Sequence, residues 1–354
     1  AGGPRQSIGP ISAVPEMAAV RPIDGGAAGT GGIGPIGDAT AVVAPRRHHE
    51  GKEERCATPR HPEFRIAMLL PWLSSSDAHL PSWVPFFLAT AAHSSLLVDW
   101  LIFHEGGVDS GANNHLRAQL PSNVHLFELK QGAMASLVGR AMAKSLQLPE
   151  QNTTAIVNRM RYMFGKWPRL VAEYKPAFGT VFAQYLPNYT HWGYSDLDVV
   201  LGQLPRFIER SELMDHHIVS YSFGDMEAVY LRGQWTVHQN TPKVNDIWKA
   251  CKHLGHGLQN ELFNKVAWAR RMEAMGKKSY HKRFLSAEGC YSYRAAYTEG
   301  LRIKVATKQF VGLQTAQAAN EDVYVLRGAL WLCQRGGGAP DVRALRAASP
   351  PACD

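Results

Sequence analysis

Two aspartates separated by one apolar residue form the group of side chains with the clearest chemistry. They are Asp196 and Asp198, on either side of Leu197. On an extended backbone, residues two apart point to the same side, so both carboxylates would meet one cation while Leu197 enters the core. Carboxylates suit a hard divalent ion such as Mn²⁺ or Mg²⁺. An ion held there would bridge the phosphates of a nucleoside diphosphate and stabilise its charge as it leaves.

Four further side chains are candidates for binding the nucleotide or the metal. Lys175, next to Pro176, suits a diphosphate or the capping of local structure. Asp77 follows the first strand in a polar loop and suits a nucleotide contact or an ordinary turn. Tyr194 stands just before the acidic pair and joins the nucleotide candidates. His238, in an apolar strand, suits a metal shell or a structural place in the core.

The acidic pair belongs to a longer block of sequence. Residues 174–179 read YKPAFG, and residues 191–202 read HWGYSDLDVVLG. This block resembles a family of glycosyltransferase-like proteins, largely classed as a domain of unknown function. In that family Asp-aromatic-Lys-Pro-Ala-Tyr/Phe-Gly precedes Trp-Gly-Tyr-x-Asp-x-Asp-x-x-x-Gly at a similar spacing. Glu173 replaces the first Asp here, and the resemblance spans roughly residues 64–250.

The resemblance implies a GT-A fold and a nucleotide-sugar donor. It implies direct metal coordination by Asp198, and contact of Asp196 with the ribose or a metal-bound water. The expected function is metal-dependent transfer of a sugar from a nucleotide diphosphate to a hydroxyl of a glycan, lipid or protein. If the transfer inverts the anomeric carbon, a carboxylate must take the proton of the acceptor hydroxyl. Glu288 is the first candidate for this catalytic role and Asp225 the second.

Two other functions stay open at this stage. A carbohydrate-binding or scaffold protein could keep the GT-A fold without turnover, although the intact acidic pair speaks against it. A metal-dependent nucleotidyltransferase or phosphohydrolase also uses carboxylate pairs on α/β sheets. The absence of a Gly-rich P-loop and the Trp-Gly-Tyr sequence before the pair count against this second alternative.

The elements that must position these residues follow from the apolar runs. Strands are expected at residues 64–70, 98–103, 124–129, 217–221 and 235–238, and helices at 133–148, 153–173, 176–186 and 243–254. Their alternation predicts a Rossmann-like α/β fold with a mixed, mainly parallel sheet flanked by helices. The acidic pair then follows a strand at the carboxyl edge of the sheet, where ligands collect. Residues 323–326 and 329–333 predict a closing hairpin.

Composition bounds the domain. The chain has 354 residues, 45% of them hydrophobic, which suits one enzyme-sized domain with unstructured ends. Residues 1–63 hold no aromatic residue and are rich in Gly, Ala and Pro, which predicts a disordered leader or stalk. A single catalytic domain is expected over residues 64–335, and a disordered tail over 336–354.

Charge and short motifs bear on partners and location. The net charge of +8 suits an acidic partner, but no basic stripe with interleaved aromatics indicates nucleic acid. No apolar run of about 20 residues is present, so membrane association is expected only through an anchor missing before Ala1. The sequons at Asn152 and Asn188 favour a secretory lumen such as the Golgi. The five cysteines form no C-x-x-C pair and allow at most two disulfides.

Overall fold

The computed structural model describes residues 63–74, 80–81, 84–106, 114–199, 201–222, 229–231, 233–276, 287–308, 321–326, 329–334 and 342–344. Only the backbone is described from residue 321 onward. The candidate residues Asp77 and Asp225 lie outside the described residues, as do most of the expected leader and tail.

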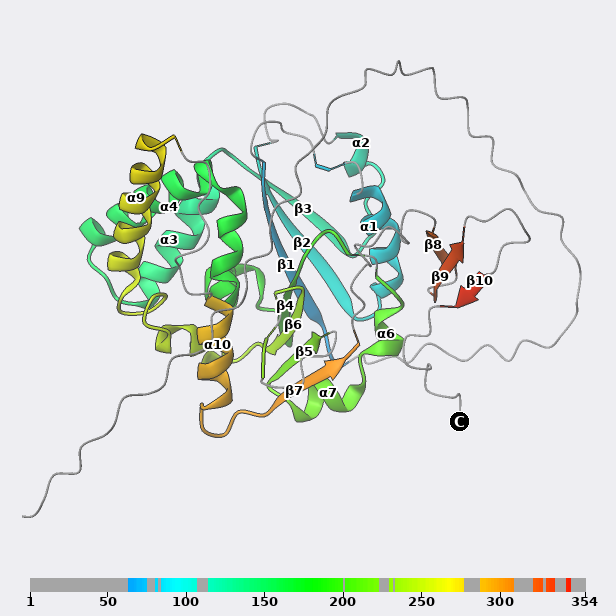
Figure 1. Cartoon of the computed structure of the whole chain (residues 1–354). Helices are drawn as coiled ribbons and strands as arrows, with labels where there is room; N and C mark the ends of the chain where they lie inside the picture. Colours follow the sequence, from blue (N-terminus) through cyan, green and yellow to red (C-terminus); the bar gives the residue numbers. More distant parts are fainter. Residues whose placement is uncertain are drawn as a thin grey trace, which may run out of the picture. The chain divides into compact units, whose positions relative to one another are not determined.

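A seven-stranded sheet lies at the centre of the fold (Figure 1). In spatial order its strands are β3 (Val124–Leu129), β2 (Val98–Glu105), β1 (Ile66–Leu73), β4 (His191–Ser195), β6 (Trp235–Gln239), β5 (Ile218–Ser222) and β7 (Ile303–Thr307). Strand β6 runs antiparallel to β4 and β5, and every other neighbouring pair is parallel. The expected mixed, mainly parallel sheet is confirmed.

The strand order reverses at β1. The chain passes from β1 outward to β2 and β3, and then returns to place β4 on the other side of β1. In open α/β sheets such a switch point opens a crevice beyond the carboxyl ends of the two strands on either side of it. The ends of β1 and β4 are therefore the place where a ligand site is expected.

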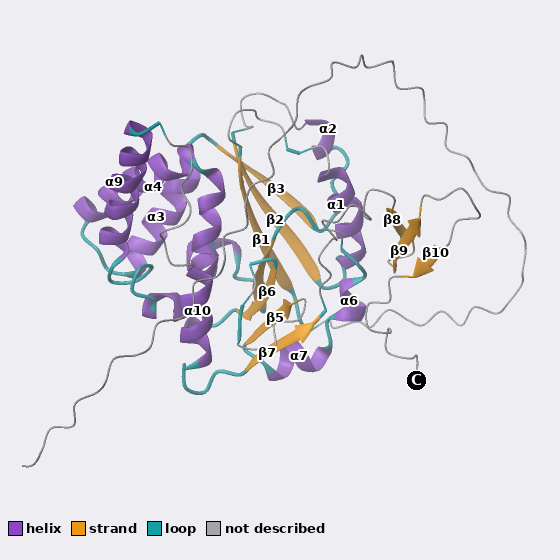
Figure 2. Cartoon of the chain, in the orientation of Figure 1, coloured by secondary structure: helices purple, strands orange, loops and turns teal. Residues whose placement is uncertain are grey.

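Helices cover both faces of the sheet (Figure 2), as the sequence predicts. One face packs on the longer helices α3 (Ala133–Ser145), α4 (Glu150–Lys166), α9 (Leu258–Ala274) and α10 (Ala287–Ala296). The other face packs on α1 (Val84–Ala91), α6 (Leu204–Phe207) and α7 (Arg210–Asp215). The short helix α2 (Asn114–Arg117) and the 3-10 turn η1 (Ala92–Ser94) complete the first half. Two apolar cores result, one on each face.

Strand β1 shows why its sequence is an unbroken apolar run. Ile66, Met68 and Leu70 enter one core, and Ala67 and Leu69 enter the other. Alternate residues of a strand point to opposite faces, so a strand covered on both faces needs apolar side chains throughout. Burial of both faces, rather than one, therefore accounts for the pattern.

Strand β1 continues past Pro71, where the sequence predicts its end. Pro71 pairs with Phe103 of β2, whereas the ladder between β1 and β4 stops at Leu69. Proline lacks the N–H that a ladder on both sides would require. The strand accommodates it where one of the two ladders has ended.

Three expected helices are shorter or divided. The helix expected at 153–173 is α4 followed by the 3-10 helix η2 (Pro168–Ala177). Pro168 lacks an N–H and disfavours helical geometry at the residue before it, and Trp167 has φ −139° and ψ 81°. The remaining segments form α5 (Phe178–Val181), η3 (Ala183–Tyr185), α8 (Pro242–Asn245) and η4 (Ile247–Ala250).

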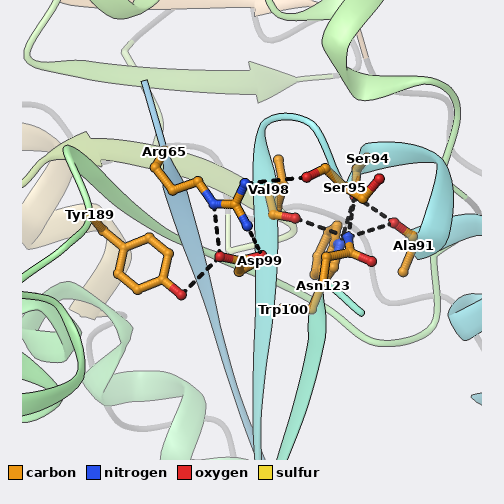
Figure 3. Close-up of polar contacts among 9 residues, drawn as sticks. All are labelled: Arg65, Ala91, Ser94, Ser95, Val98, Asp99, Trp100, Asn123 and Tyr189. Atoms are coloured by element: carbon orange, nitrogen blue, oxygen red, sulfur yellow. Dashed lines mark hydrogen bonds and ion pairs between the residues drawn. The ribbon is translucent and has the colours of Figure 1, made fainter. Parts of the chain in front are cut away.

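A partly buried polar network holds the amino ends of β1 and β2 together (Figure 3). Arg65 donates through Nε and Nη2 to the two oxygens of Asp99, at 2.9 and 2.6 Å. The Tyr189 hydroxyl donates to Asp99 Oδ2 at 2.9 Å. Burial, followed by the negative charge of Asp99, raises the pKa of Tyr189 to about 12. Asn123 donates to the backbone oxygens of Ala91 and Val98, which ties β3 to the start of β2.

The carboxyl-terminal segment forms a separate three-stranded sheet. Strands β8 (Glu321–Leu326) and β9 (Ala329–Gln334) pair as the predicted hairpin, and β10 (Val342–Ala344) adds to β9. Part of the segment expected to be a disordered tail is therefore a strand.

Among the described residues no helix is both long and apolar enough to span a bilayer. Cys251 and Cys290 are free thiols.

Candidate functional site

The acidic pair lies directly beyond β4, at the switch point of the sheet. Strand β4 ends at Ser195, and Asp196 is the next residue. Leu197 is buried in the core, as expected, while Asp198 is exposed. The backbone bends at Leu197 and Asp198 instead of continuing extended, because the strand has already ended. The two carboxylates are thus placed by a turn, and the extended geometry expected from the sequence is corrected.

Lys175 forms an ion pair with Asp196, and it is buried. Its Nζ lies 2.6 Å from Asp196 Oδ1 and 2.7 Å from the backbone oxygen of Gly233. The same nitrogen lies 5.7 Å from the centre of the Tyr194 ring. A buried ammonium needs such partners to offset its lost hydration. Lys175 is therefore part of the acidic site, rather than a surface residue that caps a local turn.

The two motifs of the sequence block pack on each other. A Cβ on Gly179 would lie 2.5 Å from the indole of Trp192, so only glycine permits this approach. The Trp192 indole N–H in turn donates to Asn245 Oδ1 at 2.6 Å. Gly179 ends the YKPAFG segment and Trp192 begins the Trp-Gly-Tyr segment. Their contact explains how Lys175 reaches Asp196.

Glu288, the first candidate for a catalytic base, lies at the same site. It stands in the first turn of α10 and accepts a hydrogen bond from the Tyr230 hydroxyl at 3.0 Å, through Oε2. Its Oε1 lies against Gly233, where an added Cβ would collide with it and would come within 3.4 Å of Lys175 Nζ. Glu288 and Lys175 therefore meet at Gly233, just before β6 begins.

Tyr194 has a different place from the one expected of a nucleotide contact. Its ring is fully buried beside the core, beneath the Lys175 ammonium. Burial raises the pKa of the Tyr194 hydroxyl well above its usual value, and the negative charge of Glu288 raises it further. The Tyr194 ring has no exposed surface and lies against the Lys175 ammonium.

His238 lies too deep in the sheet to join Asp196. It pairs with Trp192 in the β4–β6 ladder, four residues before Asp196 along the chain, or about 13 Å along a strand. Its ring is fully buried and stacks on Trp192, with ring centres 4.0 Å apart. Burial lowers the pKa of His238 to about 3, so the imidazole is neutral. We therefore remove His238 from the metal candidates and assign it to the core.

Glu173, the departure from the family pattern, lies away from the acidic pair. Its carboxylate forms an ion pair with the buried Lys265 on α9, which also lies 3.5 Å from Glu261. Glu173, directly before the YKPAFG segment, thus attaches η2 to the helical layer through Lys265.

Donor chemistry limits what the site can hold. Within the described part of the chain, no three His, Cys, Asp or Glu side chains are grouped to form a metal site from protein ligands alone. Mg²⁺ and similar ions are commonly bound by one or two carboxylates together with substrate phosphates. Asp196 and Asp198 fit that second arrangement, and their oxygens suit a hard cation.

Tyr230 and Gly233 are the residues that the sequence interpretation missed as parts of the site. Gly233 lies within the expected resemblance over residues 64–250, and its position shortly before a strand is the available signal. Tyr230 carries no sequence signal, because its partner Glu288 is 58 residues away.

Part of the chain is similar to a family of unknown function. Residues 159–327 match the model described as "Family of unknown function (DUF6625)", a segment that contains Lys175, Asp196, Asp198 and Glu288. This match does not test the expected resemblance to glycosyltransferase-like proteins over residues 64–250. No curated protein matches the chain. One solved structure, described as that of a transferase mutant, is 12% identical, covers 68% of this chain and 88% of that chain, and has a TM-score of 0.32.

Proposed function

We propose that this protein is a metal-dependent glycosyltransferase that moves a sugar from a nucleotide diphosphate to a hydroxyl of a glycan, lipid or protein. One observation carries the proposal. Asp196, held by the buried Lys175, lies with Asp198 at the carboxyl end of β4, beside the switch point of the sheet. The resemblance of residues 174–202 to GT-A glycosyltransferase-like proteins supports the same reading.

Formal charge at the site favours a divalent cation. Among the described residues of the site, Asp196, Asp198 and Glu288 carry three formal negative charges and Lys175 carries one positive charge, an excess of two negative charges. In the proposed reaction Asp196 and Asp198 hold Mn²⁺ or Mg²⁺. The bound ion would supply Lewis-acid stabilisation of the departing diphosphate.

Lys175 and Glu288 have separate roles in the proposal. A lysine ammonium has three N–H donors, and Asp196 and Gly233 take two of those of Lys175. In the proposal the third donates to a phosphate oxygen of the sugar donor. Glu288 takes the proton of the acceptor hydroxyl as that oxygen bonds to the anomeric carbon.

Calorimetry with nucleotide-sugars tests the proposal directly. UDP- and GDP-sugars are titrated one at a time into the wild-type protein in the presence of Mn²⁺. At least one of these donors should bind. Asp198→Ala should abolish that binding without unfolding the protein, because Asp198 is exposed. Absence of binding to the wild type across the panel would refute the proposed function.

A catalytically inactive carbohydrate-binding or scaffold protein is the alternative. It predicts donor binding without release of free nucleotide diphosphate. An assay of donor hydrolysis or transfer, with saturating donor and Mn²⁺, separates the two functions. Turnover that is lost in Glu288→Gln, with donor binding retained, supports the transferase.

A further inference from the structure

Residues 229–231 lie between the end of β5 and the start of β6 and are attached to helix α10 by side-chain contacts. The Tyr230 hydroxyl donates to Glu288 Oε2 at 3.0 Å. The Leu231 backbone N–H donates to the buried Ser292 Oγ at 2.8 Å. Ser292 Oγ itself donates to the Glu288 backbone oxygen at 2.7 Å. Two neighbouring residues of this segment therefore bind side chains in the first two turns of α10.

Gly233, two residues after Leu231, contacts Lys175 on the acidic side of the site. The Gly233 backbone oxygen accepts from Lys175 Nζ, which is also bound to Asp196. Glu288 Oε1 lies so close to Gly233 that a Cβ there would overlap it. Tyr230, Leu231 and Gly233 thus set the position of Glu288 relative to Asp196, although α10 and β4 are remote in sequence.

From this arrangement we infer that Tyr230 is a positioning residue for the reaction, an inference that rests on the proposed function. Its hydrogen bond occupies one oxygen of Glu288 and fixes the rotation of the carboxylate. The other oxygen stays on the side of Gly233, Lys175 and Asp196. In the step that this serves, the acceptor proton passes to Glu288 and the acceptor oxygen bonds to the anomeric carbon. The bond from that carbon to the diphosphate oxygen breaks, and its electron pair leaves with the diphosphate.

Tyr230→Phe removes the hydroxyl and keeps the ring, and Tyr293→Phe is its matched control. Tyr293 lies on the same helix as Glu288 but is 57% exposed. The assay uses the sugar donor that binds in calorimetry, at saturating concentration and with Mn²⁺. Under these conditions Tyr230→Phe should lower kcat for nucleotide diphosphate release about 10- to 100-fold, because small misplacements of catalytic groups have effects of this size. Its Kd for the donor should stay within about twofold of wild type, because Asp196 and Asp198 are untouched. Tyr293→Phe should match wild type in both.

A second pair of variants tests the other half of the arrangement. Gly233→Ala places a methyl group against Glu288 Oε1, whereas Gly289→Ala meets no atom within 4 Å. Gly233→Ala should lower kcat at least as much as Tyr230→Phe, and Gly289→Ala should leave it unchanged. Both proteins are checked for folding by circular dichroism.

The outcomes separate this inference from the proposed function. An active wild type with unchanged kcat in Tyr230→Phe overturns the positioning role alone. Equal losses of kcat and donor affinity in Tyr230→Phe also overturn it, because they indicate a general structural defect. A wild type that binds no donor refutes the proposed function, and the positioning role with it.

Discussion

The Lys175 ammonium lies 2.6 Å from Asp196 Oδ1, and the two side chains differ in exposure, at 7% and 37%. The lysine is enclosed by the protein, while the carboxylate still reaches solvent. A charge enclosed in this way depends on its partner more than a solvated charge does. The ion pair is thus a structural contact for Lys175, while Asp196 remains exposed to solvent at the candidate site.

Replacing each aspartate by alanine should therefore have different effects on stability. Asp196→Ala leaves Lys175 buried with Gly233 O as its remaining hydrogen-bond acceptor among the described residues, and should lower the free energy of unfolding by about 1.5–3 kcal/mol. Asp198→Ala removes an exposed side chain and should change it by less than about 0.5 kcal/mol. Urea unfolding of both variants beside wild type measures the difference. Equal stabilities for the two variants would contradict the structural role of the ion pair.

The contact of Gly179 with Trp192 predicts a second effect. A methyl group at residue 179 would lie 2.5 Å from the indole, so Gly179→Ala should destabilise the protein by about 1–3 kcal/mol or more. Gly165→Ala is the control, since Gly165 lies within α4 and nothing is within 4 Å of its added Cβ. That variant should be about 0.5–1 kcal/mol more stable than wild type. Thermal unfolding of the two proteins gives the comparison, and a Gly179→Ala protein as stable as wild type would show that the motifs do not pack as described.

Buried histidines predict a loss of stability in acid. Burial lowers the pKa of His238 to about 3 and that of His191 to about 4, from 6.5 in the unfolded chain. Below pH 6.5 the unfolded chain therefore binds protons that the folded protein does not, so stability falls as the pH falls toward these values. Above pH 6.5 the stability that depends on these neutral imidazoles is fully present.

His238→Phe tests this pH dependence. The phenyl ring keeps the stack on Trp192 but cannot be protonated. The slope of unfolding free energy against pH, measured with urea between pH 7 and 5, should become shallower by up to about 1.4 kcal/mol per pH unit. Substitution of the exposed His256 by Gln is the control. An unchanged slope in His238→Phe would show that His238 is protonated in the folded protein.

Much of the sheet could be predicted from the sequence, because burial dictates residue type along each strand. The predicted strand at 124–129 coincides with β3, and the runs at 98–103 and 235–238 lie within β2 and β6. The acidic pair follows a strand end, as expected, because the apolar run before it stops at Ser195. Apolar runs also predict a sheet covered by helices on both faces, and the two cores confirm this.

The composition of the site depended on the packing of distant segments. Periodicity reports how far each residue is buried, but not which element lies beside it. Four segments contribute to the site: Lys175 lies in η2, Asp196 just after β4, Gly233 just before β6, and Glu288 in α10. They meet because β6 lies antiparallel beside β4. Sequence alone therefore singled out the acidic pair and proposed Lys175 and Glu288 separately. The strand register and the side-chain contacts place His238 and Tyr194 in the core. They also bring Tyr230 and Gly233 next to Glu288.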